Sequence, residues 1–230
     1  RLPGLPHAAD AKHCRRCGRP YVYDAVYLGH LGRYRCPQCG AARPQPAVVA
    51  REGALAGTRR ARFALHVDGR RATVELPLPG LYNVYNALGA AALCHALGVP
   101  LEEIAAGLAS VSAAFGRAET IPLDGRDLSI LLIKNPAGAN EVLRTLALED
   151  GPVDVLAVLN DNVADGRDVS WLWDVDFEML AELGLPVIAA GIRGHDLALR
   201  MKYAGLSDEL LDASVAGRPW AEVVDHLLAA

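Results

Sequence analysis

The run Val153-Asp154-Val155-Leu156-Ala157-Val158-Leu159 is almost continuously apolar over the length of one β-strand. Such a run is typical of a strand in a parallel sheet that helices cover on both faces. From residue 128 onward, similar runs alternate with helical patterns. We predict strands at 128–133, 153–159 and 186–190, and helices at 140–148, 177–183 and 196–204. This alternation predicts a parallel α/β sheet.

The preceding half has a different pattern. Residues 62–67 and 72–76 alternate apolar and polar side chains around the turn residues Asp68-Gly69, which indicates a β-hairpin. Residues 81–97 and 101–111, separated by Pro100, are rich in alanine and leucine and are predicted to be helices. The pattern changes between residues 115 and 122, so we expect two domains, at residues 1–115 and 116–230.

Four cysteines form two CxxC pairs, Cys14 with Cys17 and Cys36 with Cys39, with eighteen residues between the pairs. This spacing predicts a structural zinc ribbon at about residues 10–45 that closes four thiolates around one Zn²⁺. Two disulfides or four unrelated thiols are the alternatives, but the chain has no recognisable secretory leader or transmembrane run. Cys94 has no CxxC partner, and we expect it to be a small buried apolar residue.

The composition, with 230 residues, 52% hydrophobic residues and a net charge of −4, is that of two globular domains. Six arginines lie near the CxxC pairs, and we predict them to be solvated and to bind no nucleic acid: Arg15, Arg16, Arg19, Arg33, Arg35 and Arg43. No amphipathic basic helix is evident, so we expect any approach to a membrane to be through a substrate or a partner. The chain begins without methionine, and we expect a preceding segment.

Three loops follow predicted strands, where open α/β sheets bind ligands. In residues 134–140, Lys134 is placed to meet an anion and Asn140 to cap the next helix. Residues 160–168 contain three carboxylates, two amides and an arginine, and two tryptophans follow them, either packed on the sheet or at a protein interface. In residues 191–196, we expect Asp196 to cap a helix rather than to orient His195.

The chain resembles the MurT family, the Mur-ligase-like subunits of lipid II isoglutaminyl synthase. The resemblance covers nearly all 230 residues and rests on the ribbon, on residues 79–88 (PGLYNVYNAL), on Gly116-Arg117-Ala118-Glu119, on residues 134–140 and above all on residues 161–178. It implies part of a Mur ligase central domain with an inserted zinc ribbon, followed by a Rossmann-like C-terminal α/β domain.

The resemblance also implies an activity: ATP-dependent amidation of the α-carboxylate of D-glutamate in the stem peptide of lipid II, which gives D-isoglutamine. The ammonia would come from a separate glutaminase subunit, GatD, in a heterodimer at the cytoplasmic face of the membrane. The family is thought to lend an aspartate across the interface to the glutaminase triad. We predict that this residue is Asp168, with Asp174 and then Asp176 as alternates.

Six further residues are expected to contact substrate or nucleotide: Asn83, Asn86, Arg117, Lys134, Asn135 and Arg193. Asn83 and Asn86 lie three residues apart on one helical face, although Asn83 is equally placed to cap the helix. The sequence contains no G-x-x-x-x-G-K-[ST] motif and no Gly-Lys dipeptide. We therefore expect ATP and Mg²⁺ to bind in the complete subunit and these 230 residues alone to be inactive.

Two alternatives remain open from the sequence. The first is a zinc-ribbon module that binds nucleic acid or protein, which salt-sensitive affinity for nucleic acid would reveal. The second is another Mur-type amide ligase, of the folylpolyglutamate or cyanophycin kind, which would need no glutaminase.

Overall fold

The computed structural model describes residues 11–28, 31–113, 118–123 and 125–229. It divides into two compact units, each described here by itself. The first contains the described residues up to Leu132 together with Arg144–Leu148, and the second contains Ile133–Leu143 and the described residues from Glu149 on. The predicted boundary at residue 115 and the predicted ligand residue Arg117 lie outside the described residues.

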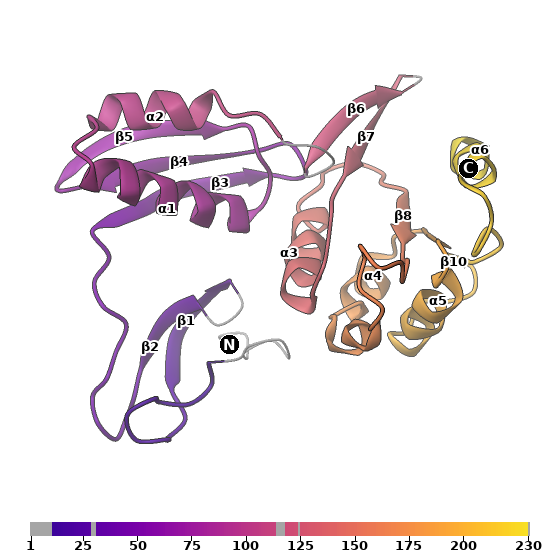
Figure 1. Cartoon of the computed structure of the whole chain (residues 1–230), viewed down its shortest axis with the longest axis horizontal. Coiled ribbons are helices and arrows are strands. Elements are labelled where there is room, and N and C mark those ends of the chain that lie inside the picture. The colour runs from indigo at the N-terminus through magenta and orange to yellow at the C-terminus, as the bar shows by residue number, and fades with distance from the viewer. Residues whose placement is uncertain (1–10, 29–30, 114–117, 124, 230) are drawn as a thin grey trace. The chain divides into compact units, whose positions relative to one another are not determined.

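The core of the first unit is a three-stranded antiparallel sheet of β3 (Val48–Ala56), β4 (Arg60–Val67) and β5 (Arg70–Leu76), with β4 in the middle. Helices α1 (Leu81–Ala96) and α2 (Leu101–Ala109) lie along this sheet (Figure 1). Alternate residues of β4 and β5, among them Phe63, Leu65 and Val74, are at most 2% exposed and pack into one core with the helices. The predicted hairpin is confirmed, with Val67 opposite Arg70.

The cysteine segment carries its own two-stranded antiparallel sheet, β1 (Val22–Leu28) and β2 (Leu31–Arg35). Three tyrosines of this segment form a cluster of tilted rings, with ring centroids 4.7 Å apart for Tyr21 and Tyr34 and 5.8 Å apart for Tyr23 and Tyr34. Such a small sheet buries too little apolar surface to be stable alone. Apolar burial by these two strands alone therefore does not account for the stability of the segment.

Residues 119–130 differ from the prediction. We expected residues 128–133 to begin the parallel sheet, but β6 (Glu119–Leu123) and β7 (Arg126–Ile130) form a separate antiparallel hairpin. Gly125, with φ of 81°, lies at the turn between them. Strand periodicity was correctly identified at 128–130, but periodicity alone does not say which neighbour a strand pairs with.

The second unit contains the parallel sheet, with strand order β10-β9-β8. β8 (Val155–Val158) pairs with β9 (Val187–Ala190), which pairs with the short β10 (Leu211–Asp212). All four residues of β9 are buried, as expected for a strand covered on both faces. Helix α5 (Gly194–Tyr203) contacts β9 and β10, while Val223 and Leu227 of α6 (Trp220–Ala229) pack against Ile188 and Ala190 of β9.

Two shorter helices and α3 complete this part of the chain. The 3-10 helix η1 (Ser170–Asp174) leads into α4 (Glu178–Leu183), and α3 (Pro136–Leu146) precedes β8. Helix α3 begins four residues earlier than predicted, because the Asn135 side chain, rather than that of Asn140, accepts the hydrogen bond of an N-terminal amide, from Gly138 N at 2.8 Å. Asn135-Pro136 is the stronger start signal, since proline is favoured at the first helical position.

Candidate functional site

The four predicted metal ligands lie together. The Sγ atoms of Cys14, Cys17, Cys36 and Cys39 are all within 4.8 Å of one another, and the closest pairs are Cys17–Cys36 at 3.4 Å and Cys14–Cys39 at 3.5 Å. The closest pairs lie between the two CxxC turns, and all four thiols are free. A tetrahedral metal ion with sulfur ligands needs this convergence, with Zn–S distances of about 2.3 Å.

The two CxxC turns have the same backbone geometry. Gly18 N donates to Cys14 O at 2.8 Å and Gly40 N to Cys36 O at 3.1 Å, and both glycines have positive φ, 72° and 71°. The amide of each first cysteine also donates, at 2.7 Å, to a carbonyl five residues later, Arg19 O for Cys14 and Ala41 O for Cys36. Each turn thus presents its two thiols from a fixed backbone, a geometry that suits a metal knuckle.

The ionisation of the thiols is strongly uneven. Burial raises the pKa of Cys14, but hydrogen bonds from the Arg16 and Cys17 backbone and contacts with Cys39 and Tyr21 outweigh it and lower the pKa to about 6. The Arg19 backbone lowers the pKa of Cys17, but the neighbouring thiols Cys36, Cys39 and Cys14 and burial raise it to about 12. Four adjacent thiolates repel one another, and a bound dication would remove that repulsion.

The loops after β8 and β9 are held together at their bases. Arg193 Nη1 donates to Asp161 Oδ2 at 3.1 Å, and its Nε donates to Asp196 Oδ2 at 2.6 Å. Ile192 N also donates to Asn160 Oδ1 at 3.0 Å. A side chain at Gly191, where φ is 90°, would clash with Leu159 O, so only glycine lets the loops approach this closely.

This arrangement changes the interpretation of Arg193. Two carboxylates already satisfy its guanidinium, and both raise the pKa of Arg193, Asp196 more than Asp161. Arg193 also lowers the pKa of Asp196, whose carboxylate is turned to this ion pair instead of capping α5. The expected cap by Asp196 is therefore wrong, because a charged partner three residues earlier competes successfully for the carboxylate.

Asp168 lies exposed in the loop between β8 and η1. Its Oδ1 accepts a hydrogen bond from Ser170 N at 2.9 Å, which closes a local turn. Hydrogen bonds from the Ser170 side chain and backbone lower the pKa of Asp168. Asp168 is therefore an exposed acid whose ionised form is favoured by its local hydrogen bonds.

Asp176 is placed differently, in a reciprocal pair with Asn140 of α3. Asn140 Nδ2 donates to Asp176 Oδ2 and Asp176 N donates to Asn140 Oδ1, both at 2.9 Å. Asn140 is 3% exposed and Asp176 is half-buried, so both bonds are partly shielded from water. Asp174, at the end of η1, is exposed. The three candidate acids thus have three different environments within nine residues.

Arg200 of α5 fixes the rest of this segment, and no pattern in the sequence pointed to it. Its side chain is 7% exposed, and Nη2 donates to Val175 O at 2.6 Å and to Glu178 Oε1 at 3.0 Å. Its guanidinium carbon lies 5.7 Å from the ring centre of Trp173 and 5.6 Å from that of Phe177. The guanidinium thereby connects α5 to both sides of the junction between η1 and α4.

The predicted asparagines of α1 do meet. Asn83 Nδ2 donates to Pro79 O at 2.8 Å, and Asn86 Nδ2 donates to Asn83 Oδ1 at 3.3 Å. Asn83 is 9% exposed and lies inside the helix, whose N-cap is Gly80 and not Asn83. Asn83 therefore acts as a buried support for the helix start, and exposed Asn86 retains the amide oxygen as an acceptor. Lys134 and Asn135 lie exposed before α3.

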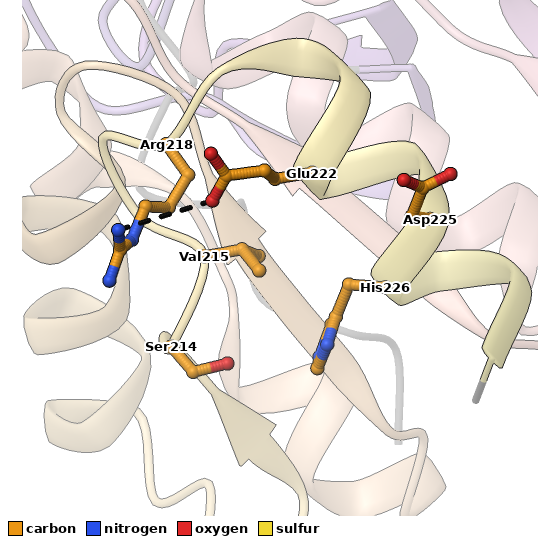
Figure 2. A pocket seen from close by; sticks show the side chains of 6 residues that line it. All are labelled: Ser214, Val215, Arg218, Glu222, Asp225 and His226. Atoms are coloured by element: carbon orange, nitrogen blue, oxygen red, sulfur yellow. Dashed lines mark ion pairs between the residues drawn. The ribbon is translucent and has the colours of Figure 1, made fainter.

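Two hollows lie beside the parallel sheet in the second unit. One is at the carboxyl ends of β8 and β9, where Asn160, Ile192 and Trp220 are among its lining residues. The other is open and polar, and Figure 2 shows its lining residues on α6 and on the loop before it. There His226 Nε2 lies 2.6 Å from Asp212 Oδ2, and this pair links α6 to β10. No motif in the sequence indicated the pair.

Residues 132–221 match the family described as MurT ligase C-terminal. The chain is 34% identical over 197 residues to the subunit MurT of the lipid II isoglutaminyl synthase (glutamine-hydrolyzing) of Streptococcus pneumoniae, covering 85% of this chain and 43% of that one. It is 33% identical over 218 residues to the corresponding subunit from Staphylococcus aureus, covering 94% and 48%.

Among solved structures, a pseudomurein peptide ligase type C from Methanothermus fervidus matches with a TM-score of 0.67 and 25% identity, over 99% of this chain and 45% of that one. The predicted Mur ligase-like α/β fold is thereby confirmed. The chain spans less than half the length of the curated relatives it matches. Among the described residues, no helix is both long and apolar enough to cross a membrane.

Proposed function

Because this chain belongs to the MurT family, as a C-terminal portion of such a subunit, we propose that it serves in the glutamine-dependent amidation of lipid II. The proposed reaction is the one for which the relatives are named, the glutamine-dependent synthesis of isoglutaminyl lipid II. Its acceptor would be the α-carboxylate of D-glutamate in the stem peptide. The site of action is the cytoplasmic face of the membrane. The support is the identity to two curated MurT subunits over most of this chain.

The chemistry proposed proceeds in two steps. The α-carboxylate oxygen attacks the γ-phosphorus of ATP, which releases ADP and leaves an acyl phosphate. Ammonia then attacks the acyl carbon, phosphate leaves with the bonding electrons, and the nitrogen loses a proton to give the amide of D-isoglutamine. ATP with Mg²⁺ supplies the phosphoryl group and charge neutralisation when bound. Because the sequence has no G-x-x-x-x-G-K-[ST] motif, we propose that the phosphates are held elsewhere in the complete subunit and that these 230 residues alone do not turn over ATP.

Residues of this chain that remain available for the anionic ligands are Lys134, Asn135, Asn86 and, outside the described residues, Arg117. Lys134 is an exposed cation directly before α3, and the positive end of a helix dipole adds to its attraction for phosphate or carboxylate. Asn83 would act through Asn86, which it contacts. Arg193 would act by holding the loops after β8 and β9, since its charge is paired with Asp161 and Asp196.

We further propose that Asp168 completes the catalytic triad of a separate glutaminase subunit, GatD. The observation that carries this assignment is the contrast within one segment: residues 173–178 are fixed by Asn140 and Arg200, while Asp168 lies exposed and ionised beside them. A carboxylate that orients a histidine of the partner must be charged and must reach across an interface. Asp174, exposed at the end of η1, is the next choice, and Asp176, already bound to Asn140, is the last.

The four cysteines are proposed to hold a structural Zn²⁺. A closed four-sulfur site has no open position for a substrate, so the ion would order the segment and take no part in the amidation.

The experiment mixes the glutaminase subunit from the same source with this chain and measures glutamate release. Wild type is expected to stimulate hydrolysis, and Asp168→Asn, which preserves size and removes the charge, is expected to bind without stimulating. Asp165→Asn is the matched control, because Asp165 is an exposed acid of the same loop that hydrogen-bonds only to nearby Asn162 in the described contacts. Gel filtration of each mixture reports whether the complex forms.

If bound Asp168→Asn stimulates like wild type, Asp168 is the wrong acid, and Asp174→Asn is tested next. If wild type neither binds nor stimulates the glutaminase, the proposed function itself is contradicted. If both variants bind the glutaminase subunit and only Asp165→Asn stimulates glutamine hydrolysis, the result supports the assignment of Asp168.

A further inference from the structure

The positive charge of this chain is concentrated in its cysteine segment. Residues 11–47, called the ribbon from here on, contain seven lysines and arginines and one acid, Asp24, which gives a net charge of +6. Since the whole chain carries −4, the remaining residues together carry −10. Four thiolates around a dication would reduce the ribbon's charge by two, which leaves +4. Such a separation of charge within one chain indicates a negatively charged partner for the ribbon.

The arginines of the ribbon are not neutralised within the protein. Five of them are exposed, and none of the five forms an ion pair within the described part of the chain: Arg15, Arg16, Arg19, Arg33 and Arg35. By contrast, Arg62, Arg70 and Arg71 of the neighbouring sheet pair with Glu75, Glu102 and Glu52. Three of the five arginines in the β3–β5 sheet thus have an acidic partner, whereas none of the five exposed ribbon arginines has one within the described residues.

The ribbon hairpin separates its arginines from its aromatic core. Along β2, Arg33 and Arg35 are exposed, and the intervening Tyr34 is turned to the other face, where it contacts Tyr23. Directly opposite Arg35 on β1 is Val22, an apolar side chain that is 40% exposed. One face of the hairpin therefore combines two free guanidinium groups with an exposed apolar residue.

The remaining arginines add to the same electrostatic field. Arg15 and Arg16 lie between the cysteines of the first CxxC turn, and Arg19 follows it. A compact unit of this length has a radius of gyration of about 9 Å, which is close to the Debye length of about 8 to 10 Å at physiological salt. Neighbouring charges, such as Arg33 and Arg35 on one face of β2, are therefore only partly screened from each other and act together on a surface nearby. Tyr27, 39% exposed and 5.8 Å from the Arg43 guanidinium, is an amphipathic side chain of the kind found at bilayer interfaces.

We propose that the ribbon is an electrostatic docking surface for an anionic phospholipid bilayer. A lipid surface is favoured over nucleic acid because the proposed function, on which this choice rests, places the acceptor on a lipid. No helix among the described residues is long and apolar enough to span a membrane, so the proposal concerns contact with the bilayer surface. Each basic residue near an anionic bilayer contributes about 1 kcal/mol of attraction, and exposed aromatic or apolar side chains add to it. The sequence-based expectation that these arginines are merely solvated is replaced by this proposal.

The test is co-sedimentation of this chain with vesicles that contain no lipid II. Wild type is expected to bind vesicles of equal parts phosphatidylcholine and phosphatidylglycerol and to dissociate from them at high salt. It is expected not to bind vesicles of pure phosphatidylcholine. Each exposed arginine that is removed should weaken binding about fivefold, so the double variant Arg33→Gln, Arg35→Gln should bind roughly 25-fold more weakly. Because these vesicles carry no acceptor, the result does not depend on whether the amidation itself is correct.

The control is the double variant Arg59→Gln, Arg60→Gln, which removes the same charge from two adjacent exposed arginines outside the ribbon. It is expected to bind within about twofold of wild type. Near-UV circular dichroism of the tyrosine cluster shows whether the ribbon of each variant is folded.

Three results would overturn the proposal. The first is absence of binding to anionic vesicles by wild type, and the second is an equal loss in the ribbon variant and in the control, which would indicate net charge alone. The third is salt-sensitive binding to a DNA or RNA duplex that outcompetes the vesicles, which would make nucleic acid the partner.

Discussion

Asn140 and Asp176 exchange two hydrogen bonds of 2.9 Å between residues 36 positions apart. Asn140 is almost fully buried on α3, and Asp176 lies between η1 and α4. The amide side chain of Asn140 can donate and accept at the same time, so it binds both the carboxylate and the backbone N–H of Asp176. This pair, together with Arg200, holds the end of the acidic segment while its beginning stays exposed.

Replacing Asn140 by alanine removes both bonds and is expected to lower the free energy of unfolding by about 1 to 3 kcal/mol, because polar groups of Asp176 lose their buried partner. Urea denaturation followed by tryptophan fluorescence measures the change. Asn162→Ala is the control, since Asn162 is exposed and bonds only locally to Asp165 in the described contacts. An equal effect of both substitutions would contradict the structural role of the Asn140 pair.

Arg200→Lys is expected to lower the free energy of unfolding by about 1 to 3 kcal/mol. A lysine ammonium keeps the charge but lacks the planar group that spans Val175 O, Glu178 and the rings of Trp173 and Phe177. Urea unfolding, with fluorescence of Trp173 as one reporter, measures the effect.

Arg218→Lys provides the matched comparison for Arg200, because Arg218 is 62% exposed and its ion pair with Glu222 is long, at 4.0 Å. We expect a change below about 0.5 kcal/mol. If Arg200→Lys is as mild as this control, the guanidinium geometry contributes nothing to the junction between η1 and α4.

Metal analysis of purified protein is expected to find about one zinc ion per chain. Cys36→Ser should abolish retention of the ion through gel filtration, because Cys36 is a buried member of the four-sulfur cluster. The near-UV circular dichroism of Tyr21, Tyr23 and Tyr34 should decrease on treatment with a chelator, since metal binding and ordering of the ribbon are coupled.

Cys94→Ser, which removes the one cysteine outside this cluster, should leave the zinc content unchanged. A wild-type protein that contains no metal after preparation under reducing conditions, and binds none when zinc is added, would exclude the zinc ribbon.

Asp212 should make stability depend on pH at the acid end. Hydrogen bonds from Ser214 and then the contact with His226 lower its pKa below the ordinary 3.8, so the folded state favours the ionised form. The resulting stability is fully present above pH 3.8 and is lost as the pH falls through the lowered pKa. Asp212→Asn is expected to cost less than about 1 kcal/mol at neutral pH, because the carboxylate is 41% exposed, and nothing in strong acid.

Urea unfolding of wild type and Asp212→Asn across this pH range checks the sign. Asp208→Asn, at an acid that is 84% exposed, is the control and should change stability little at any pH. A gap between wild type and Asp212→Asn that persists in strong acid would show that the contribution is not electrostatic.

Much of the fold followed from local patterns. The hairpin of β4 and β5, helices α1 and α2, and the strands β8 and β9 were predicted close to their observed bounds, because each is a periodic or continuously apolar run with glycine or proline near at least one end. The antiparallel β6–β7 hairpin was not predicted, because the choice of a strand's pairing partner leaves little trace in one sequence. Helix α6 was not predicted either, although its sequence is amphipathic.

For the candidate sites, the sequence by itself determined which residue types are present and which lie close along the chain: two CxxC turns, an acidic loop and a cluster of arginines near the cysteines. Only the tertiary structure decided how they are used. It brought four thiols within 4.8 Å, engaged Asp176 and Arg193 with partners more than thirty residues away, and left Asp168 exposed. The physical reason is that the environment of a side chain depends on burial and on hydrogen-bond partners, and distant segments supply both.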